Sequence, residues 1–319
     1  MFKTPDRDTG SIFVVACILF CVWGVVFIQA LPIQRELTAP ELFSAVSLPA
    51  SSVIYPLVTY VPVPLERPSP SPLSIAIPSI QARSALLFDI SANSSVFAYQ
   101  ASAVSAVGSV TKLMTALVVS EHYGVDDQGM ITISAEDMAV EYPSKIIAPG
   151  DQLRVSEAIR ILLLGSDNSV ALALARAVAS STQNFVGQMN IRAYSLGMVN
   201  SSFADPVGFL GNVSSPLDLA VLMRYLVNHR PDLLQISSYP YLTLILDSGK
   251  VITVVNTNIL ADKIPGFIGG KTGFLEEAGG SLVTVFRLRD QTLATVVLGS
   301  PDRFGDTAQL IQWYLKQPE

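Results

Sequence analysis

Proline divides this chain into a segment unsuited to regular packing and a long remainder that can fold. Ten of its 20 prolines lie between Pro32 and Pro78, including a Pro-Ser-Pro-Ser-Pro run at 68–72. Each proline removes a backbone hydrogen-bond donor and favours extended polyproline geometry. We therefore expect a Pro/Ser-rich linker over residues 31–78 and one folded domain over residues 79–319.

An apolar stretch precedes the linker. Ile12 to Ile28 form an uncharged run of 17 residues, at the short end of a membrane span and longer than a typical signal-peptide core. In Ile28-Gln29-Ala30, a bulky residue stands where a cleavage site requires a small one. An uncleaved transmembrane signal-anchor over residues 11–30 is therefore favoured, with a cleaved signal as the alternative.

The charges around this run predict its orientation. Lys3 and Arg7 precede the run, and Arg35 follows it. Because an excess of positive charge marks the cytoplasmic side of a span, residues 1–10 are expected to be a cytoplasmic N-terminus. The chain is then predicted to be a single-pass protein of the cell membrane, with its domain on the extracytoplasmic side.

Charge and residue usage argue against several classes of protein. A formal net charge of −6 leaves no basic footprint for nucleic acid. The histidines are His122 and His229, far apart in sequence, and both cysteines, Cys17 and Cys21, lie in the apolar run. Since no Cys-x-x-Cys pattern or histidine cluster is present, we expect no metal site and no cofactor.

A serine and a lysine stand three residues apart in the largely apolar stretch 108–117. In a helix, positions i and i+3 lie on one face, so Ser109 and Lys112 would come within reach of each other. Burial favours the neutral form of a lysine, and a neutral amine can take the proton of a serine. A core helix with one snorkelling lysine is the alternative interpretation.

Two further motifs follow, and each alone has an ordinary explanation. Ser166-Asp167-Asn168 separates an alanine-rich helical segment from an earlier one that ends at Gly165, for which Ser156 is a plausible N-cap. A pair of helix caps would account for this break. Lys271-Thr272-Gly273 follows two glycines, and a glycine-rich turn with one solvated lysine would account for it.

Together, the motifs Ser109-x-x-Lys112, Ser166-x-Asn168 and Lys271-Thr272-Gly273 resemble those of the penicillin-recognising serine enzymes. The chain is similar to the D-alanyl-D-alanine carboxypeptidase family, the low-molecular-weight penicillin-binding proteins, over about residues 80–316. The likeness includes Asn256-Thr257-Asn258. Strand-like segments at both ends of the domain, with helices between them, predict an α+β fold. The resemblance implies a β-lactamase/transpeptidase-like fold: an antiparallel sheet flanked by helices, plus a helical subdomain that carries Ser166-x-Asn168.

Acyl transfer requires a nucleophile, a base, an oxyanion site and groups that hold the substrate. Ser109 is expected to be the nucleophile and Lys112 its base. Ser166 can relay a proton to the leaving amine, and Asn168 can orient Lys112 or hold a substrate amide. Lys271 is a second cation that would help to keep Lys112 neutral.

The third motif is expected to hold the substrate. Lys271 and Thr272 suit a terminal carboxylate, and Gly273 would let substrate backbone lie against the strand. The resemblance implies an oxyanion hole made by the backbone N–H groups of Ser109 and Phe274. The expected partners are D-alanyl peptides of peptidoglycan, with β-lactam antibiotics as covalent inhibitors.

Alternatives to a carboxypeptidase remain within the resemblance. A D,D-endopeptidase is one, because Asp167 replaces the usual glycine and Leu275 stands where threonine is frequent. A class A β-lactamase would match Ser166-Asp167-Asn168 literally, but those enzymes rely on a glutamate that is absent from Ala158 to Leu275. An inactive wall-binding relative is the least favoured, because all three motifs are intact.

Overall fold

The computed structural model describes residues 77–318. The predicted cytoplasmic N-terminus, the signal-anchor at 11–30 and nearly all of the linker at 31–78 lie outside these residues. Between residues 77 and 318, no helix is both long enough and apolar enough to cross a membrane.

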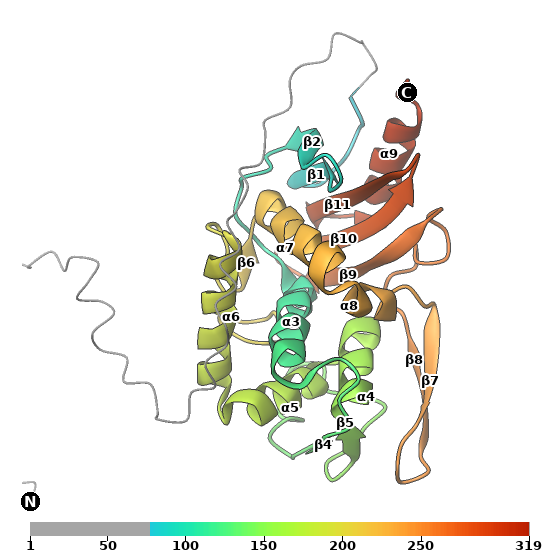
Figure 1. Ribbon diagram of the computed structural model, residues 1–319. Coiled ribbons are helices and arrows are strands. Elements are labelled where there is room, and N and C mark those ends of the chain that lie inside the picture. Colours follow the sequence, from blue (N-terminus) through green and yellow to red (C-terminus); the bar gives the residue numbers. More distant parts are fainter. Residues whose placement is uncertain (1–76, 319) are drawn as a thin grey trace, which may run out of the picture. The chain divides into compact units, whose positions relative to one another are not determined.

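Among the described residues, a five-stranded antiparallel sheet is ordered β2-β1-β11-β10-β9 (Figure 1). Its strands are β1 (Ser84–Asp89), β2 (Ser94–Tyr99), β9 (Phe267–Leu275), β10 (Gly279–Leu288) and β11 (Gln291–Ser300). The two ends of the domain meet in this sheet, where Leu86 of β1 pairs with Val296 of β11. The predicted α+β architecture, with a sheet completed by both chain ends, is confirmed.

Strand β1 is buried on both faces because helices cover both sides of the sheet. Leu86 and Phe88 point into the main core, while Ala85 and Leu87 point into the smaller clusters on the opposite face. This alternation follows from the two-residue period of a strand. A strand covered on both faces therefore reads as an uninterrupted apolar run.

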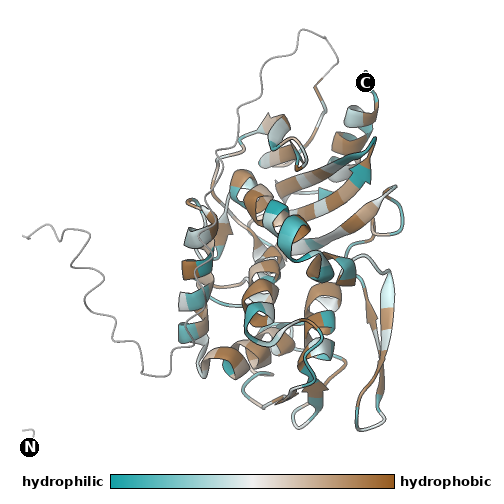
Figure 2. Ribbon diagram, in the orientation of Figure 1, coloured by the Kyte–Doolittle hydropathy of each residue, from teal (hydrophilic) through white to brown (hydrophobic). Residues whose placement is uncertain are grey.

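Helix α7 (Pro216–His229) packs against β1 and β11 from the main-core side, and α9 (Arg303–Leu315) packs against β10 and β11 from the other. The central strands are correspondingly rich in hydrophobic residues, whereas the helices show mixed faces (Figure 2). Helix α7 begins as the sequence dictates: Ser215 caps it by accepting a hydrogen bond from Asp218 N, and Pro216 occupies the first turn.

A helical subdomain lies between the two parts of the sheet in sequence. Its elements are the 3₁₀ turn Gly108–Thr111, α3 (Lys112–Tyr123), α4 (Val155–Arg160), the π-helical turn Ile161–Gly165, α5 (Asn168–Ala179) and α6 (Thr182–Leu196). Helix α3 contacts α5, α6 and the π-helical turn. Its residues are buried from Lys112 to Ser120. Such burial on all sides explains why this helix is apolar around most of its circumference.

Smaller elements complete the described part of the chain. Three two-stranded ladders pair β3 (Ser105–Ala106) with β6 (Val213–Ser214), β4 (Met130–Thr132) with β5 (Gln152–Arg154), and β7 (Tyr241–Ile245) with β8 (Val251–Val255). The short helix α8 (Pro231–Ile236) contacts β9 and the π-helical turn.

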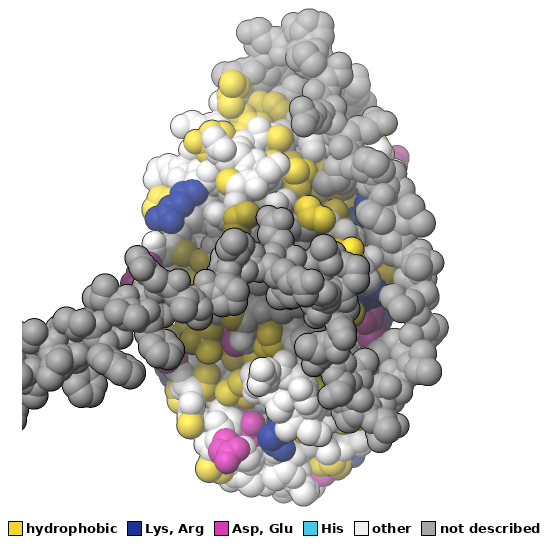
Figure 3. All heavy atoms as spheres, turned by 90° about the vertical axis from the view of Figure 1, so that its left-hand side faces the viewer, with side chains coloured by type: hydrophobic (Ala, Val, Ile, Leu, Met, Phe, Trp, Pro, Cys, Tyr) yellow, Lys and Arg dark blue, Asp and Glu magenta, His cyan; other side chains and the backbone are white. Residues whose placement is uncertain are grey.

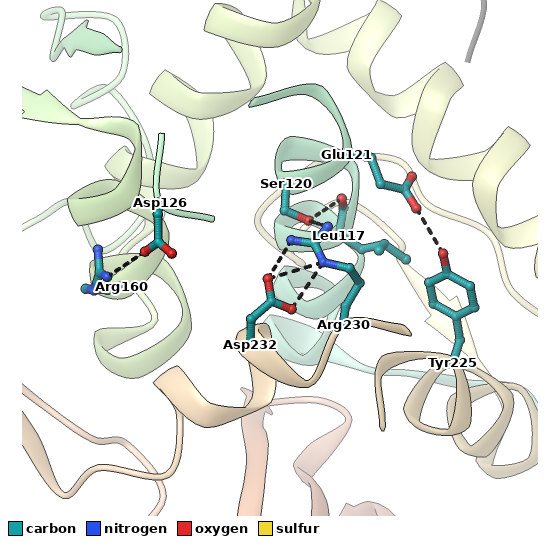
Figure 4. A network of polar contacts seen from close by, with 8 residues as sticks. All are labelled: Leu117, Ser120, Glu121, Asp126, Arg160, Tyr225, Arg230 and Asp232. Carbon is teal, nitrogen blue, oxygen red and sulfur yellow. Dashed lines mark hydrogen bonds and ion pairs between the residues drawn. The ribbon is translucent and has the colours of Figure 1, made fainter. Parts of the chain in front are cut away.

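The C-terminal end of α3 is held by a polar network (Figure 4). Arg230 donates to the hydroxyl of the buried Ser120 at 2.5 Å and pairs with Asp232 at 2.9 Å. On the next residue of the helix, Glu121 pairs with Arg192 of α6 at 2.6 Å. These contacts tie α3 to α6 and to the start of α8, so the helix that carries Lys112 is fixed at the end remote from that residue.

Helix α6 lies at the side of the domain that faces the viewer in Figure 3. Hydrophobic side chains are more frequent than charged ones among those visible on this face. On α6 itself, Ile191 and Tyr194 are exposed on the outer side, while Phe185 and Met189 are buried on the inner side. The inner residues pack into the main core with α3 and α5.

Candidate active site

The predicted nucleophile and base are in direct contact. Ser109 lies in the 3₁₀ turn that leads into α3, and Lys112 is the first residue of that helix. The Nζ of Lys112 is 2.8 Å from the Oγ of Ser109. Lys112 is completely buried, whereas Ser109 is only half-buried and can be reached from solvent. The spacing of three residues therefore has the consequence expected from the sequence.

Three acceptors surround the amine of Lys112. Besides Ser109 Oγ, it donates to Oδ1 of Asn168 at 2.8 Å and to the backbone oxygen of Val207 at 2.9 Å. These two oxygens can only accept hydrogen bonds. When Lys112 is neutral, its two N–H bonds can serve Asn168 and Val207, and its lone pair then faces Ser109. The arrangement therefore aims a base at the serine hydroxyl.

The environment adjusts Lys112 to this task. Burial lowers the pKa of Lys112 from 10.5 to about 7, and the carboxylates of Asp205 and Asp167 act in the opposite direction. A lysine in apolar surroundings loses hydration that favours its charged form, which is why burial has this sign. Near neutral pH, a substantial fraction of Lys112 is therefore unprotonated and able to act as a base.

A second serine–lysine pair is formed by the other two motifs. Ser166 follows the π-helical turn and adopts a left-handed conformation, with φ of 63°. Its Oγ accepts a hydrogen bond from Nζ of Lys271 in β9 at 2.8 Å, and Lys271 also donates to the backbone oxygen of Thr272 at 3.1 Å. Lys271 is 1% exposed, so it is not the solvated lysine of a surface turn.

The charge of Lys271 is coupled to that of its neighbours. Burial, the positive charge of Lys112 and that of Arg303 all lower the pKa of Lys271 well below its ordinary value. Repulsion between two cations is mutual, so loss of the proton from Lys112 raises the pKa of Lys271. The sequence led to the expectation that Lys271 helps to keep Lys112 neutral. The lowered pKa of Lys112 is due to burial, and the repulsion between the two lysines is expressed in the lowered pKa of Lys271.

The residues Ser166-Asp167-Asn168, which separate the π-helical turn from α5, have two different roles: one caps a helix and the others contact the two lysines. Asp167 caps α5, where its Oδ1 accepts a hydrogen bond from Val170 N at 3.0 Å. Asn168 reaches Lys112 with its oxygen and donates with its Nδ2 to the backbone oxygens of Glu141 and Tyr142 at 2.8 and 3.1 Å. The helix-cap interpretation is thus correct for Asp167, while Ser166 and Asn168 face the two lysines.

Backbone segments converge around Ser109 because three glycines leave room for them. A Cβ on Gly208 would lie 2.2 Å from Gly108 O, and one on Gly273 would lie 2.2 Å from Val107 O. Gly108 itself has φ of 55°, and a Cβ there would be 3.0 Å from Phe274 N. The backbone N–H groups of Ser109 and Phe274 are consequently brought to the same corner of the site, as the predicted oxyanion hole requires.

Sequence reasoning missed the loop that supports Lys112. The carboxylate of Asp205 is buried and accepts hydrogen bonds from the backbone N–H groups of Val207, Gly208, Phe209 and Leu210. These bonds hold Val207 so that its backbone oxygen reaches Lys112. Asn212 closes the loop by donating to Thr111 Oγ1 at 3.0 Å. Asp205-Pro206-Val207-Gly208 reads as a turn in the sequence, and nothing in that pattern signals contact with the predicted base, Lys112.

Arg303 was also missed. It lies at the start of α9, half-buried, with its guanidinium carbon 5.9 Å from the centre of the Phe274 ring. Its Nε is buried and makes no hydrogen bond, and its charge lowers the pKa of Lys271. A lone arginine at the beginning of a closing helix has no local signature. Only the pairing of β9, β10 and β11 brings it beside the third motif.

The described site therefore brings together a half-buried serine in contact with a buried lysine, two backbone N–H groups in one corner, and Arg303 beside a second buried lysine. This set defines a serine acyl-transfer site. The family model for D-alanyl-D-alanine carboxypeptidase matches residues 71–302, and the chain belongs to this family of serine peptidases.

Similar proteins fall in two groups by activity. The chain is 30% identical over 224 residues to a D-alanyl-D-alanine endopeptidase of Haemophilus influenzae, covering 69% of this chain and 76% of that protein. It is 29% identical over 229 residues to the D-alanyl-D-alanine carboxypeptidase DacF of Bacillus subtilis, covering 69% of this chain and 58% of that one.

A solved relative has the same fold. Penicillin-binding protein D2 of Listeria monocytogenes, in its ampicillin-bound form, superposes with a TM-score of 0.67 at 25% identity, covering 76% of this chain and 100% of that one. The antiparallel sheet flanked by helices is thus the fold of penicillin-binding proteins, as the sequence predicted.

Proposed function

We propose that this protein is a serine-type D-alanyl-D-alanine carboxypeptidase that acts on peptidoglycan stem peptides through an acyl-enzyme on Ser109, with Lys112 as its base. One observation carries the proposal: the buried Nζ of Lys112 is hydrogen-bonded to Ser109 Oγ and to two oxygens that can only accept. When the amine is neutral and donates to those two oxygens, its lone pair points toward Ser109 Oγ.

Acylation begins when Lys112 takes the proton of Ser109. The serine oxygen attacks the carbonyl carbon of the penultimate D-alanine, and the oxyanion is stabilised by the N–H groups of Ser109 and Phe274. The C–N bond then breaks, and Ser166 passes a proton to the departing amine. Ser166 suits this relay because it lies 2.8 Å from Nζ of Lys271, a group able to return the proton.

The departing D-alanine carries the terminal carboxylate. Lys271, Thr272 and Arg303 supply cations and a hydroxyl at one end of the site, where they would hold that carboxylate. Gly273 lets the peptide backbone approach β9, the edge strand of the sheet. After the free D-alanine leaves, Lys112 gives its proton to solvent and Lys271 recovers one from solvent. The neutral Lys112 then takes a proton from the attacking water, whose oxygen adds to the ester carbonyl, and the proton returns to Ser109 Oγ as the ester bond breaks.

A D,D-endopeptidase that cuts cross-links is the second candidate. It is favoured by the similarity to endopeptidases, of which one is 30% identical to this chain. Both activities use the same acyl-enzyme and differ in the amine that leaves. In the carboxypeptidase this amine belongs to free D-alanine, and in the endopeptidase it belongs to the side chain of a neighbouring stem.

One assay pair tests the function. Purified protein is incubated with a pentapeptide ending in D-Ala-D-Ala and, separately, with a cross-linked dimer of stem peptides. Release of D-alanine from the pentapeptide is the expected result, and Ser109→Ala must abolish it. Cleavage of the dimer without release of D-alanine selects the endopeptidase. Failure to act on either substrate contradicts both candidates.

Covalent inhibition by β-lactams belongs to the same proposal. The β-lactam ring presents a strained acyl donor, and the carboxylate of the drug corresponds to that of the terminal D-alanine. The Listeria relative, solved with ampicillin, supports this expectation. A class A β-lactamase activity is not proposed, since no glutamate stands between Ala158 and Leu275.

We also propose that the domain is attached to the cell membrane by residues 11–30 and acts on its extracytoplasmic side. The support is the uncharged run of 17 residues, Ile12 to Ile28, followed by the proline-rich linker. Fractionation of cells that express the full chain, followed by protease treatment of intact spheroplasts, tests this topology. The domain should remain with membranes and be digested from outside.

A further inference from the structure

The turn between β8 and β9 contains the sequence Asn256-Thr257-Asn258, which the mechanism above does not use. Asn256 fixes this turn: its Nδ2 donates to the backbone oxygens of Ser237 and Tyr239, each at 2.8 Å, and its Oδ1 accepts from Asn258 N at 2.8 Å. Asn256 is 9% exposed and Asn258 is 2% exposed. Asn258 in turn accepts from Leu260 N at 3.1 Å with its Oδ1, so asparagine side chains hold the backbone on both sides of Thr257.

Thr257 joins the two elements that carry Ser166 and Lys271. Its backbone N donates to Leu164 O at 3.2 Å, within the π-helical turn that precedes Ser166. Its hydroxyl lies 2.6 Å from the hydroxyl of Thr272 in β9, so the two side chains share one hydrogen bond. Thr257 is half-buried and Thr272 is 5% exposed.

The chemistry of the substrate decides which hydroxyl donates. A carboxylate can only accept hydrogen bonds, so Thr272 must use its single proton toward the carboxylate when substrate is bound. The bond between the two threonines can then be kept only if Thr257 donates to Thr272. A hydroxyl that accepts one hydrogen bond becomes a better donor in another, because chains of hydrogen bonds polarise one another.

We propose that Thr257 is a positioning residue of the carboxylate subsite: it donates to Thr272 and thereby directs the Thr272 proton to the terminal carboxylate of the substrate. The inference rests on the proposed function, since it concerns the carboxylate that this function requires. Thr257 does not touch substrate in this arrangement. It acts by fixing the rotamer of Thr272 and the direction of its O–H bond.

The test uses two probes that differ only in the carboxylate. One is an N-acyl-D-alanyl thioester of thioglycolic acid, and the other is the methyl ester of the same compound. Thr257→Val removes the donor and keeps the shape, whereas Thr257→Ser keeps the donor. We expect Thr257→Val to lower kcat/KM about tenfold for the acid probe, mainly through KM, and to leave the methyl ester probe within about twofold. Thr257→Ser should restore the acid probe.

A double-mutant cycle separates an effect through Thr272 from direct contact. In a Thr272→Val background, adding Thr257→Val should have no further effect on the acid probe, because the group through which it acts is gone. A full additional loss would mean that Thr257 binds the carboxylate itself, which overturns the positioning role. Thermal unfolding of each variant shows whether the turn has been disturbed.

The possible failures are distinguishable. One outcome is that both probes acylate the natural protein and that Thr257→Val has the same kcat/KM as the natural protein for the acid probe. The inference is then wrong and the proposed function stands. If Thr257→Val lowers turnover of both probes equally, Thr257 has a general structural role and the inference is again wrong. If the natural protein is acylated by neither probe, the proposed function fails and the inference fails with it.

Discussion

Ser166 Oγ lies 2.8 Å from Nζ of Lys271, so the second serine of the site has a lysine of its own, as Ser109 has Lys112. Geometry at each pair alone would allow either serine to be activated. The difference lies in the surroundings. Lys112 has two further partners that can accept but not donate, whereas Lys271 has one, and Ser109 lies beside the backbone N–H group of Phe274. These differences support the proposed separate tasks of the two pairs, nucleophile and proton relay.

The first prediction follows from this division. Ser109→Ala should abolish covalent labelling by a fluorescent penicillin, whereas Ser166→Ala should slow labelling yet leave the label on Ser109. Mass spectrometry of the labelled tryptic peptide identifies the acylated serine. Label on Ser166 in the natural protein, or undiminished labelling of Ser109→Ala, would exchange the roles of the two serines. Circular dichroism confirms that each variant is folded.

The second prediction concerns pH. Acylation needs neutral Lys112, whose pKa is about 7, so its rate should rise as pH increases through this value. Asp167 raises the pKa of Lys112 because its negative charge favours the ammonium form. Asp167→Asn should therefore lower that pKa and move the acid limb of the rate profile by about half a pH unit to lower pH.

This substitution suits the measurement because asparagine is as good a helix cap as aspartate. Helix α5 should keep its cap, and the melting temperature should change little. Asp126→Asn is the matched control, since Asp126 pairs with Arg160 away from Lys112. If the pH–rate profile of Asp167→Asn coincides with that of the natural protein, this carboxylate does not influence the pKa of Lys112.

The third prediction concerns the close approach of backbones at Ser109. Gly208 has φ of 111°, and its Cβ would meet Gly108 O at 2.2 Å. Gly208→Ala should cost about 3 kcal/mol or more in the free energy of unfolding and remove penicillin labelling, because a backbone atom must move. Denaturant unfolding and labelling kinetics measure the two effects.

Gly211 provides the comparison within the same loop. It also has a left-handed φ, 77°, but nothing lies within 4 Å of its Cβ position. Gly211→Ala should cost only the conformational strain, about 1 kcal/mol, and should still be labelled. Equal losses in the two variants would mean that strain, rather than the contact with Gly108, determines the outcome.

The fourth prediction separates stability from activity. Arg192 pairs with Glu121 at 2.6 Å, donates to Ser195 Oγ at 3.1 Å and covers the ring of Tyr225 at 4.6 Å. Arg192→Met keeps the aliphatic bulk and removes these contacts, so the free energy of unfolding should fall by about 1–2 kcal/mol. Glu121 lies nine residues after Lys112, about 13 Å along α3, and acylation should therefore stay within about twofold of the natural rate.

Urea unfolding and penicillin labelling at 20 °C test this pair of statements. The variant must be compared under conditions where it is fully folded. A large loss of labelling in a folded protein would show that the network at the far end of α3 also sets the position of Lys112.

Much of this arrangement could be predicted from sequence because it depends on local spacing. Ser109 and Lys112 are one helical turn apart. Apolar runs in the sequence predicted the strands β1, β10 and β11. Cap positions were less predictable. Ser156 was expected to cap α4, but Arg154 occupies that position and Glu157 accepts from its N–H at 2.8 Å. A cap depends on one hydrogen bond, and several polar residues can compete for it.

Contacts made by tertiary folding alone could not be predicted. The oxygen of Val207 reaches Lys112 because the buried Asp205 organises its loop through backbone donors. Arg303 reaches the third motif because three strands place the start of α9 beside β9. Neither residue has a neighbour in sequence that reveals its contact. The roles of Ser109, Lys112, Ser166 and Lys271 remain predictions for the experiments above.

The three glycines around Ser109 come from segments that are far apart along the chain. Gly108, Gly208 and Gly273 can approach one another only after the sheet has closed and the Asp205 loop has folded over the start of α3. Parts of the chain that are distant in sequence meet slowly during folding. Penicillin labelling would thus measure completion of the whole domain, and a refolding protein should regain its secondary structure before it regains the ability to be labelled.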